Sequence, residues 1–262
     1  MKRVLLATTA LIAAAASAFA ADFPGRAAPQ AIAALPAFTW TGFYVGANAG
    51  YLWSDSDATL AAAGGAVLPI DAAQGTIPGK LKLGNDSVLG GVQAGYNVQF
   101  GMFVTGVEAD IAWTDANATA TYSALDRFAF PGLRTDTVMR SELGWLGTLR
   151  ARAGVAFDRA LVYATGGAAF GEVKNAFAIN IPALGYFSPI WTHSDTEWGW
   201  ALGGGVEYAL TRNISVKGEY LHYDLGSRTI HGTDPAVFPG ESVDYKFKNN
   251  GNVARGGINF RF

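Results

Sequence analysis

Acidic and basic residues recur two positions apart at several places in the chain, and this spacing could serve two kinds of chemistry. Glu108 and Asp110 form one such pair, and Arg150 and Arg152 form another. Side chains two positions apart share one face of a β-strand, so they could form either an ion-selective pore or gate, or a buried network that must be fully paired. The residues concerned are Glu108, Asp110, Glu142, Glu197, Glu207 and Glu219, with Arg150, Arg152, Lys217, Arg255 and Arg261.

Other candidate chemistry in the sequence is weak. His193, Ser194 and Asp195 have the residue types of a catalytic triad, but a nucleophile and its base must lie within hydrogen-bond reach, which loop neighbours rarely do. Asp55 and Asp57 could bind calcium, although the Gly and the Glu of an EF-hand loop are missing. The chain has no cysteine, which excludes disulfides and thiolate metal sites. We expect no enzymatic activity, no cofactor and no metal.

The composition is unusual for a soluble protein. Of the 262 residues, 50% are hydrophobic and only 15% are charged, whereas a soluble domain carries roughly 25% charged residues. The formal net charge of −2 provides no basic face for nucleic acid.

The N-terminus has the three parts of a secretory signal peptide. Lys2 and Arg3 precede an apolar run over residues 4–16, and Ala18-Phe19-Ala20 is a small-x-small cleavage site. We therefore expect residues 1–20 to be removed after Ala20, although an N-terminal membrane anchor is the alternative. Residues 21–38 form a Pro/Ala-rich leader, which leaves 39–262 as the folded domain.

From residue 42 onwards, apolar residues alternate with small or polar ones, which is typical of β-strands. The pattern first covers residues 42–54 and returns seven times, up to the last strand at 254–262. Three connections have two or three residues, whereas four long ones cover about 55–86, 115–140, 172–195 and 225–250. Short turns at one end and long loops at the other predict an all-β fold, an eight-stranded antiparallel transmembrane up-and-down β-barrel.

The aromatic residues indicate which face is outside. They fall into two bands near the strand ends, as in the aromatic girdles of membrane barrels, and the polar faces carry few charges. A soluble barrel with its apolar face inside is the alternative. The expected girdle residues are Phe43, Phe100, Phe103, Phe157 and Tyr208 at the inner end, and Trp53, Trp113, Trp145, Phe170, Trp198, Trp200 and Tyr220 at the outer end.

One stretch interrupts the alternation. Val243, Tyr245 and Phe247 are out of phase with Ala254 and Ile258, so the pattern slips across residues 249–252. A β-bulge near the rim or an extension of the strand above the membrane would explain the slip.

Four segments resemble a known family. WTGFYVGANAGYLW at residues 40–53, LVYATGGAAFG at 161–171, GWALGGGVEYAL at 199–210 and the C-terminal NVARGGINFRF are similar to the outer-membrane β-barrel domain of small porin-like surface proteins of Gram-negative bacteria. Members are commonly called porins, outer-membrane immunogenic proteins or surface antigens. The resemblance runs from about residue 38 to the end and implies that the chain lies in the outer membrane.

The resemblance also implies an assembly signal at the C-terminus. Arg255, Gly257, Phe260 and Phe262 match the pattern that the barrel-assembly machinery reads in this family. An unpaired last strand must add edge to edge to a template. The alternative is that these residues only face lipid.

The expected function follows from the size of the barrel. An eight-stranded barrel has an interior that side chains can fill, so we expect a charged plug and a role in envelope integrity and surface contact. A narrow channel for ions or small solutes is the alternative, and a lipid-modifying enzyme is a distant one. The expected partners are outer-membrane lipid and lipopolysaccharide, the barrel-assembly machinery, and an extracellular ligand or host surface at the loops.

Overall fold

The computed structural model describes residues 38–262. The predicted signal peptide, and the leader apart from Phe38, lie outside the described residues. Among residues 38–262, no helix has both the length and the apolar character needed to cross a bilayer.

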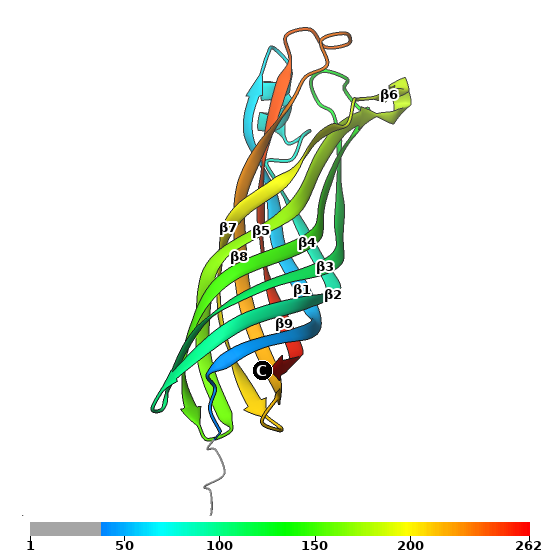
Figure 1. Cartoon of the computed structure of the whole chain (residues 1–262). Helices are drawn as coiled ribbons and strands as arrows, with labels where there is room; N and C mark the ends of the chain where they lie inside the picture. The colour runs from blue at the N-terminus through cyan, green and yellow to red at the C-terminus, as the bar shows by residue number, and fades with distance from the viewer. Residues whose placement is uncertain (1–37) are drawn as a thin grey trace, which may run out of the picture. The chain divides into compact units, whose positions relative to one another are not determined.

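Within residues 38–262, eight long strands close into a ring (Figure 1). They are β1 (Gly42–Gly64), β2 (Lys80–Phe100), β3 (Phe103–Leu125), β4 (Arg134–Phe157), β5 (Ala160–Ile181), β7 (Trp191–Ala209), β8 (Ile214–Gly232) and β9 (Ser242–Arg261). Each strand is antiparallel to both neighbours, and β9 pairs with β1 to close the barrel. The two-residue strand β6 (Tyr186–Phe187) pairs only with β5. The predicted all-β barrel is confirmed.

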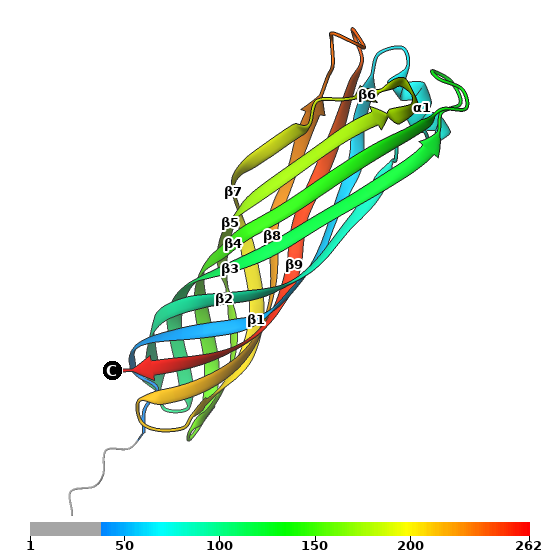
Figure 2. The ribbon, with the colours of Figure 1, turned by 90° about the vertical axis from the view of Figure 1, so that its right-hand side faces the viewer.

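The three short connections lie together at one end of the barrel, which we call the inner end. Residues 101–102 join β2 to β3, residues 158–159 join β4 to β5, and residues 210–213 join β7 to β8. Gly101 (φ 61°) and Asp158 (φ 53°) have left-handed backbones, a conformation that Gly and Asp adopt more readily than other residues. The C-terminus is at this end, opposite the helix α1 (Leu68–Gln74) and β6 (Figure 2).

The connections at the outer end are much shorter than predicted. They cover residues 65–79, which include α1, and 126–133, 182–190 and 233–241. The long-loop prediction is wrong because each strand continues well past the aromatic band, and the polarity of its two faces changes there.

Strand β9 shows how this change of polarity occurs. Val243, Tyr245 and Phe247 are buried inside the barrel on the same face as Arg255, whereas Ile258 faces outward. The pairing with β1 runs without a register shift from Tyr44 to Leu60. The neighbouring strand β8 does carry a bulge, between Asp224 and Ser227 and opposite residues 248–250, but β9 itself keeps the same alternation of inward residues from Val243 to Arg255. The strand stays in phase, and its apolar residues move from the outer face to the inner face.

The interior consists of layers that follow one another along each strand. On β4, Met139 belongs to an upper apolar layer, Leu146 to a middle apolar layer, and Ala156 to a lower one near the inner end. Arg150 and Arg152 lie between Leu146 and Ala156, so the buried charges are enclosed between the middle and lower apolar layers.

Candidate functional site

Eight of the predicted charged residues meet inside the lower half of the barrel, and we call them the charge network. Because strand side chains alternate between the two faces, residues two positions apart on β3, β4 and β8 point inward together. Four are acidic and four are basic. They are Glu108, Asp110, Glu207 and Glu219, with Arg150, Arg152, Lys217 and Arg255, and all are buried.

Arg150 is at the centre of the charge network. Its Nη2 lies 2.7 Å from Glu108 and 2.9 Å from Asp110, and its Nη1 lies 3.2 Å from Glu219. Arg255 joins the same acids, at 2.8 Å from Asp110 and 2.6 Å from Glu219. The planar guanidinium group suits such multiple contacts, because its donors form a fixed fork.

The other two cations extend the charge network sideways. Lys217 Nζ lies 2.9 Å from Glu108, and Arg152 Nη2 lies 2.8 Å from Glu207. Every charged member therefore has an oppositely charged partner, which burial away from water requires.

Neutral side chains add hydrogen bonds to the charge network. The Tyr44 hydroxyl donates to Glu108 over 2.7 Å and accepts from Arg152 over 3.1 Å, and the Tyr163 hydroxyl donates to Glu219 over 3.0 Å. Only charged residues were predicted for this site. Tyr44 and Tyr163 alternate with the apolar residues of their strands, and this alternation was the signal that could have identified them.

Three predicted members lie elsewhere, which corrects the sequence-based list. Glu142 is on the outer part of β4, where its Oε1 lies 3.7 Å from Arg140 Nη1. Glu197 pairs with Arg228 at 2.9 Å, and its β5 neighbour Gly171 lies beside Leu146 of the middle layer. These strand positions are too far along the barrel to reach Arg150.

Arg261 is the third exception, and it lies at the inner rim. Its Nη1 donates to the Thr39 carbonyl over 2.8 Å, and its guanidinium lies 4.8 Å from the centre of the Trp40 ring. This arrangement packs the segment before β1 against the end of β9.

The weaker chemical candidates do not assemble. His193, Ser194 and Asp195 lie on β7 rather than in a loop, so Ser194 points to the opposite face from the other two. Asp57 is paired with Lys80 at 2.6 Å. In the described part of the chain, no group of three or more His, Cys, Asp or Glu residues could hold a metal ion.

The four residues of the predicted assembly signal have two orientations. Arg255 points inward to the charge network, and a Cβ on Gly257 would lie 3.1 Å from the Ala47 carbonyl oxygen and 3.3 Å from Gln93 Nε2, so glycine leaves space for these groups. Phe260 and Phe262 face outward, with 73% of Phe262 exposed. The Phe262 N–H donates to the Phe43 carbonyl over 3.0 Å, which ties the last residue to β1.

The predicted girdle residues face outward from the barrel. Nine are exposed, whereas Trp53, Trp145 and Phe170 are half-buried among other rings. Phe170 lies 5.9 Å from Trp145 and 5.0 Å from Trp198, measured between ring centres, so a row of rings crosses β4, β5 and β7. Phe43 and Trp53 are ten residues apart on β1, which matches the ~9–11 residues of a tilted strand crossing a bilayer.

Comparison with known proteins agrees with this architecture. Residues 6–260 match the outer membrane protein beta-barrel domain family. The 31 kDa outer-membrane immunogenic protein of Brucella melitensis is 36% identical over 100% of both chains. A 22 kDa outer membrane protein of Rhizobium leguminosarum is 27% identical over 74% of this chain and 68% of its own.

Among solved structures, the outer membrane protein OprG from Pseudomonas aeruginosa is 14% identical, with a TM-score of 0.46 over 85% of this chain and 96% of its own. The family match and the full-length relative locate the protein in the bacterial outer membrane. The chain belongs to the outer membrane protein beta-barrel domain family.

Proposed function

We propose that this protein is a non-conducting, non-enzymatic barrel that contributes to the integrity of the outer membrane and presents its outer end to the surroundings. The observation that carries the proposal is the filling of the lumen. The charge network lies between two apolar layers, and the Arg150 side chain at its centre is 0% exposed.

The balance of charge supports the absence of conduction. Four acids and four bases, each within salt-bridge distance of a partner, leave no unpaired charge to attract a permeating ion. Ion selectivity in wide pores depends on charged rings exposed to water, and here water would have to displace the middle apolar layer first.

A non-enzymatic role is supported by the pairing of the same groups. The carboxylates of the charge network accept hydrogen bonds from Arg, Lys and Tyr, so none is held free as a general base beside a nucleophile. We also propose that Arg255, Gly257, Phe260 and Phe262 act as the recognition signal for the assembly machinery, and that the outer face contacts lipopolysaccharide.

Conductance in planar bilayers tests the closed lumen. We expect the purified full chain to give no discrete openings above the background of its detergent, while a general porin prepared in the same way gives them. Stable openings of the folded barrel, identified by its faster migration before boiling, would contradict the proposal and support the channel alternative.

The envelope role needs a separate measurement in cells. We expect a strain that lacks the protein to become more sensitive to detergent and to large antibiotics, and the wild-type chain to restore resistance. Unchanged sensitivity would contradict the envelope role without affecting the conductance result.

A further inference from the structure

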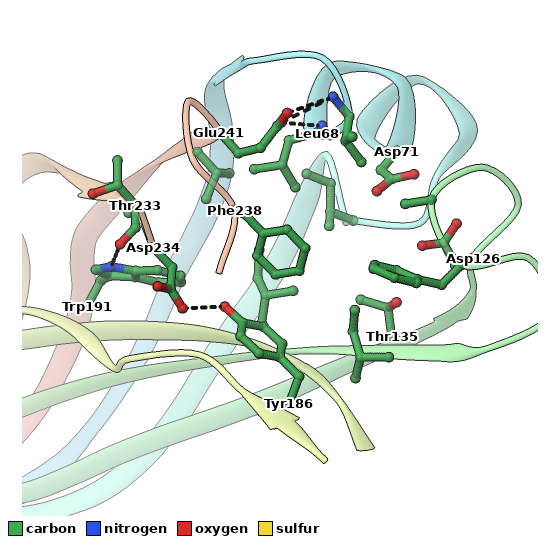
Figure 3. Close-up of a pocket in the computed structure, with 18 residues that line it drawn as sticks. Leu68, Asp71, Asp126, Thr135, Tyr186, Trp191, Thr233, Asp234, Phe238 and Glu241 are labelled. Atoms are coloured by element: carbon green, nitrogen blue, oxygen red, sulfur yellow. Dashed lines mark hydrogen bonds between the residues drawn. The ribbon is translucent and has the colours of Figure 1, made fainter. Parts of the chain in front are cut away.

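A cavity of about 60 Å³ lies at the outer end of the barrel, next to the upper apolar layer. All four outer connections contribute to its wall, with Leu68 and Asp71 from the first, Asp126 from the second, Tyr186 from the third and Phe238 from the fourth (Figure 3). We call it the outer cavity. It is separated from the charge network by the middle and upper apolar layers.

The wall of the outer cavity is mostly apolar and aromatic. The Phe238 ring centre lies 5.1 Å from that of Tyr186 and 6.3 Å from that of Phe130. Trp191 also lines the cavity, and its indole N–H is already used, since it donates to the Thr233 carbonyl over 3.1 Å. Aromatic faces attract cations because their quadrupole is negative at the face.

The charges around the outer cavity all have one sign. Four carboxylates line it, and the lining residues that the structure describes include no Lys, Arg or His. Three of the four have hydrogen-bond donors. Glu241 accepts from backbone N–H groups including that of Ala66 over 2.7 Å, Asp234 accepts from Tyr186 over 2.9 Å, and Asp126 accepts from the Phe128 N–H over 2.8 Å.

Asp71 differs from the other three acids. It is only 4% exposed, and its Oδ1 is buried without a hydrogen-bond partner. The hydroxyl of Thr135, another lining residue, is also buried without a partner. Burial, together with the negative charges of Asp126 and Glu241, raises the pKa of Asp71 to about 6. At neutral pH the site therefore holds a carboxylate with one buried oxygen, Oδ1, that lacks a donor, an arrangement that costs free energy until a donor binds.

We propose that the outer cavity binds a small primary alkylammonium ion, whose ammonium group donates hydrogen bonds to Asp71 and Thr135 and whose alkyl chain contacts the aromatic wall. The volume restricts the ligand to a short unbranched chain, because a cavity that takes benzene measures about 150 Å³. The acidic lining repels anions. The Asp71 carboxylate favours an ammonium ion over a neutral alcohol, because only the ammonium ion carries a positive charge.

Titration of the full-length barrel with n-propylammonium, in a non-ionic detergent at pH 8, tests the proposal by ligand-observed NMR. A ligand with about four heavy atoms binds no tighter than tens of micromolar, so we expect a dissociation constant from there to the low millimolar range. We expect n-propanol and propionate not to compete, and the bulkier benzylammonium to bind at least about tenfold more weakly. Equal binding of propanol or propionate would overturn the proposal.

Substitution of the acid provides the second arm. We expect Asp71→Asn to weaken binding of n-propylammonium at least about tenfold, since it keeps the shape and removes the charge. Asp136→Asn is the matched control, because Asp136 pairs with the exposed Arg134 on β4 and lies outside the cavity. The affinity of this variant for n-propylammonium should stay within about twofold of the wild-type value. Unchanged binding by a folded Asp71→Asn barrel would overturn the proposal.

The wild-type chain gives a third arm that needs no substitution. Asp126, Asp234 and Glu241 also face the cavity, so acidification can only reduce its negative charge. As the pH falls from 8 to 5, Asp71 takes up a proton near its pKa of about 6, and affinity for n-propylammonium should fall several-fold. Affinity that does not change over this range would contradict the role of Asp71.

Discussion

At the scale of single residues, Arg150 links three acids of the charge network. Its guanidinium contacts Glu108, Asp110 and Glu219, so three carboxylates would lose a partner if it were removed. Loss of one partner from a buried charge pair is strongly destabilising because the other charge remains buried.

We therefore expect Arg150→Met, which keeps most of the side-chain volume, to lower the free energy of unfolding by about 3–5 kcal/mol. Urea unfolding of the barrel in lipid vesicles, followed by tryptophan fluorescence, measures the change. The control is Arg140→Met on the same strand, whose side chain is 60% exposed, and it should change stability by less than about 1 kcal/mol. Equal effects of the two substitutions would show that the pairing inside the barrel contributes little.

The sequence predicted the face of the eight residues of the charge network but not their partners. It misplaced Glu142, because a register shift on β4 changes which residues face inward. The alternation of side chains along each strand correctly predicted that Glu197 and Arg261 face inward, yet neither residue contacts Arg150. Which ion pairs form depends on the register between strands, and two residues that both face inward can lie far apart along the barrel axis. The alternation also could not show that the hydroxyls of Tyr44 and Tyr163 would donate hydrogen bonds to Glu108 and Glu219.

At the scale of the elements, the strands were predicted correctly near the inner end and too short at the outer end. Inside the membrane, apolar residues face lipid and alternate with polar ones, which is a regular signal. Above it, the outside meets water and the inside is an apolar core, so Tyr245 and Phe247 change faces relative to Ile258. A prediction based on one continuous alternation therefore ends each strand at the point where the apolar residues change from the outer to the inner face.

Single cysteines on β9 test this reversal, and the natural chain is a clean background because it has no cysteine. Lys246 and Ile258 both face outward. We expect a water-soluble maleimide to label Lys246→Cys within minutes in intact cells, and Ile258→Cys at least about tenfold more slowly, since lipid shields it. Val253→Cys is the inward-facing control, and it should stay unlabelled. Similar labelling of Lys246→Cys and Ile258→Cys would contradict the reversal.

At the scale of the whole molecule, the barrel closes because β9 pairs with β1. Between the two aromatic bands each long strand pairs with both neighbours, as the hydrocarbon core requires, whereas the outer parts of β2 and β3, and of β7 and β8, separate from each other. Phe262 contributes one backbone bond to this closure. Its ring centre lies 5.3 Å from that of Phe260, but most of the side chain is exposed.

We expect Phe262→Ala to lower the amount of barrel in the outer membrane several-fold, if the ring is read during assembly. The assembled fraction should keep the unfolding midpoint of the wild type within about 2–3 °C, because a lone exposed side chain adds little stability. Heat-modifiable migration of membrane fractions gives the amount. Phe43→Ala is the control, since Phe43 is 66% exposed at the same end; an equal loss with Phe43→Ala would indicate a general need for inner aromatic residues.

The continuation of the strands past the outer aromatic row determines what a large molecule meets first when it approaches the cell. From Trp53 to Gly64, β1 runs eleven more residues, which at ~3.3 Å per residue and a tilt of ~40° raises the outer rim by roughly 28 Å. We expect this extension of the barrel to reach into the sugar layer of the surrounding lipids rather than to end beneath it. An antibody or a phage fibre would then bind the strands of the barrel wall as well as the connections at their ends. Its binding site would combine segments that are distant in sequence, and binding would be lost when heat unfolds the barrel.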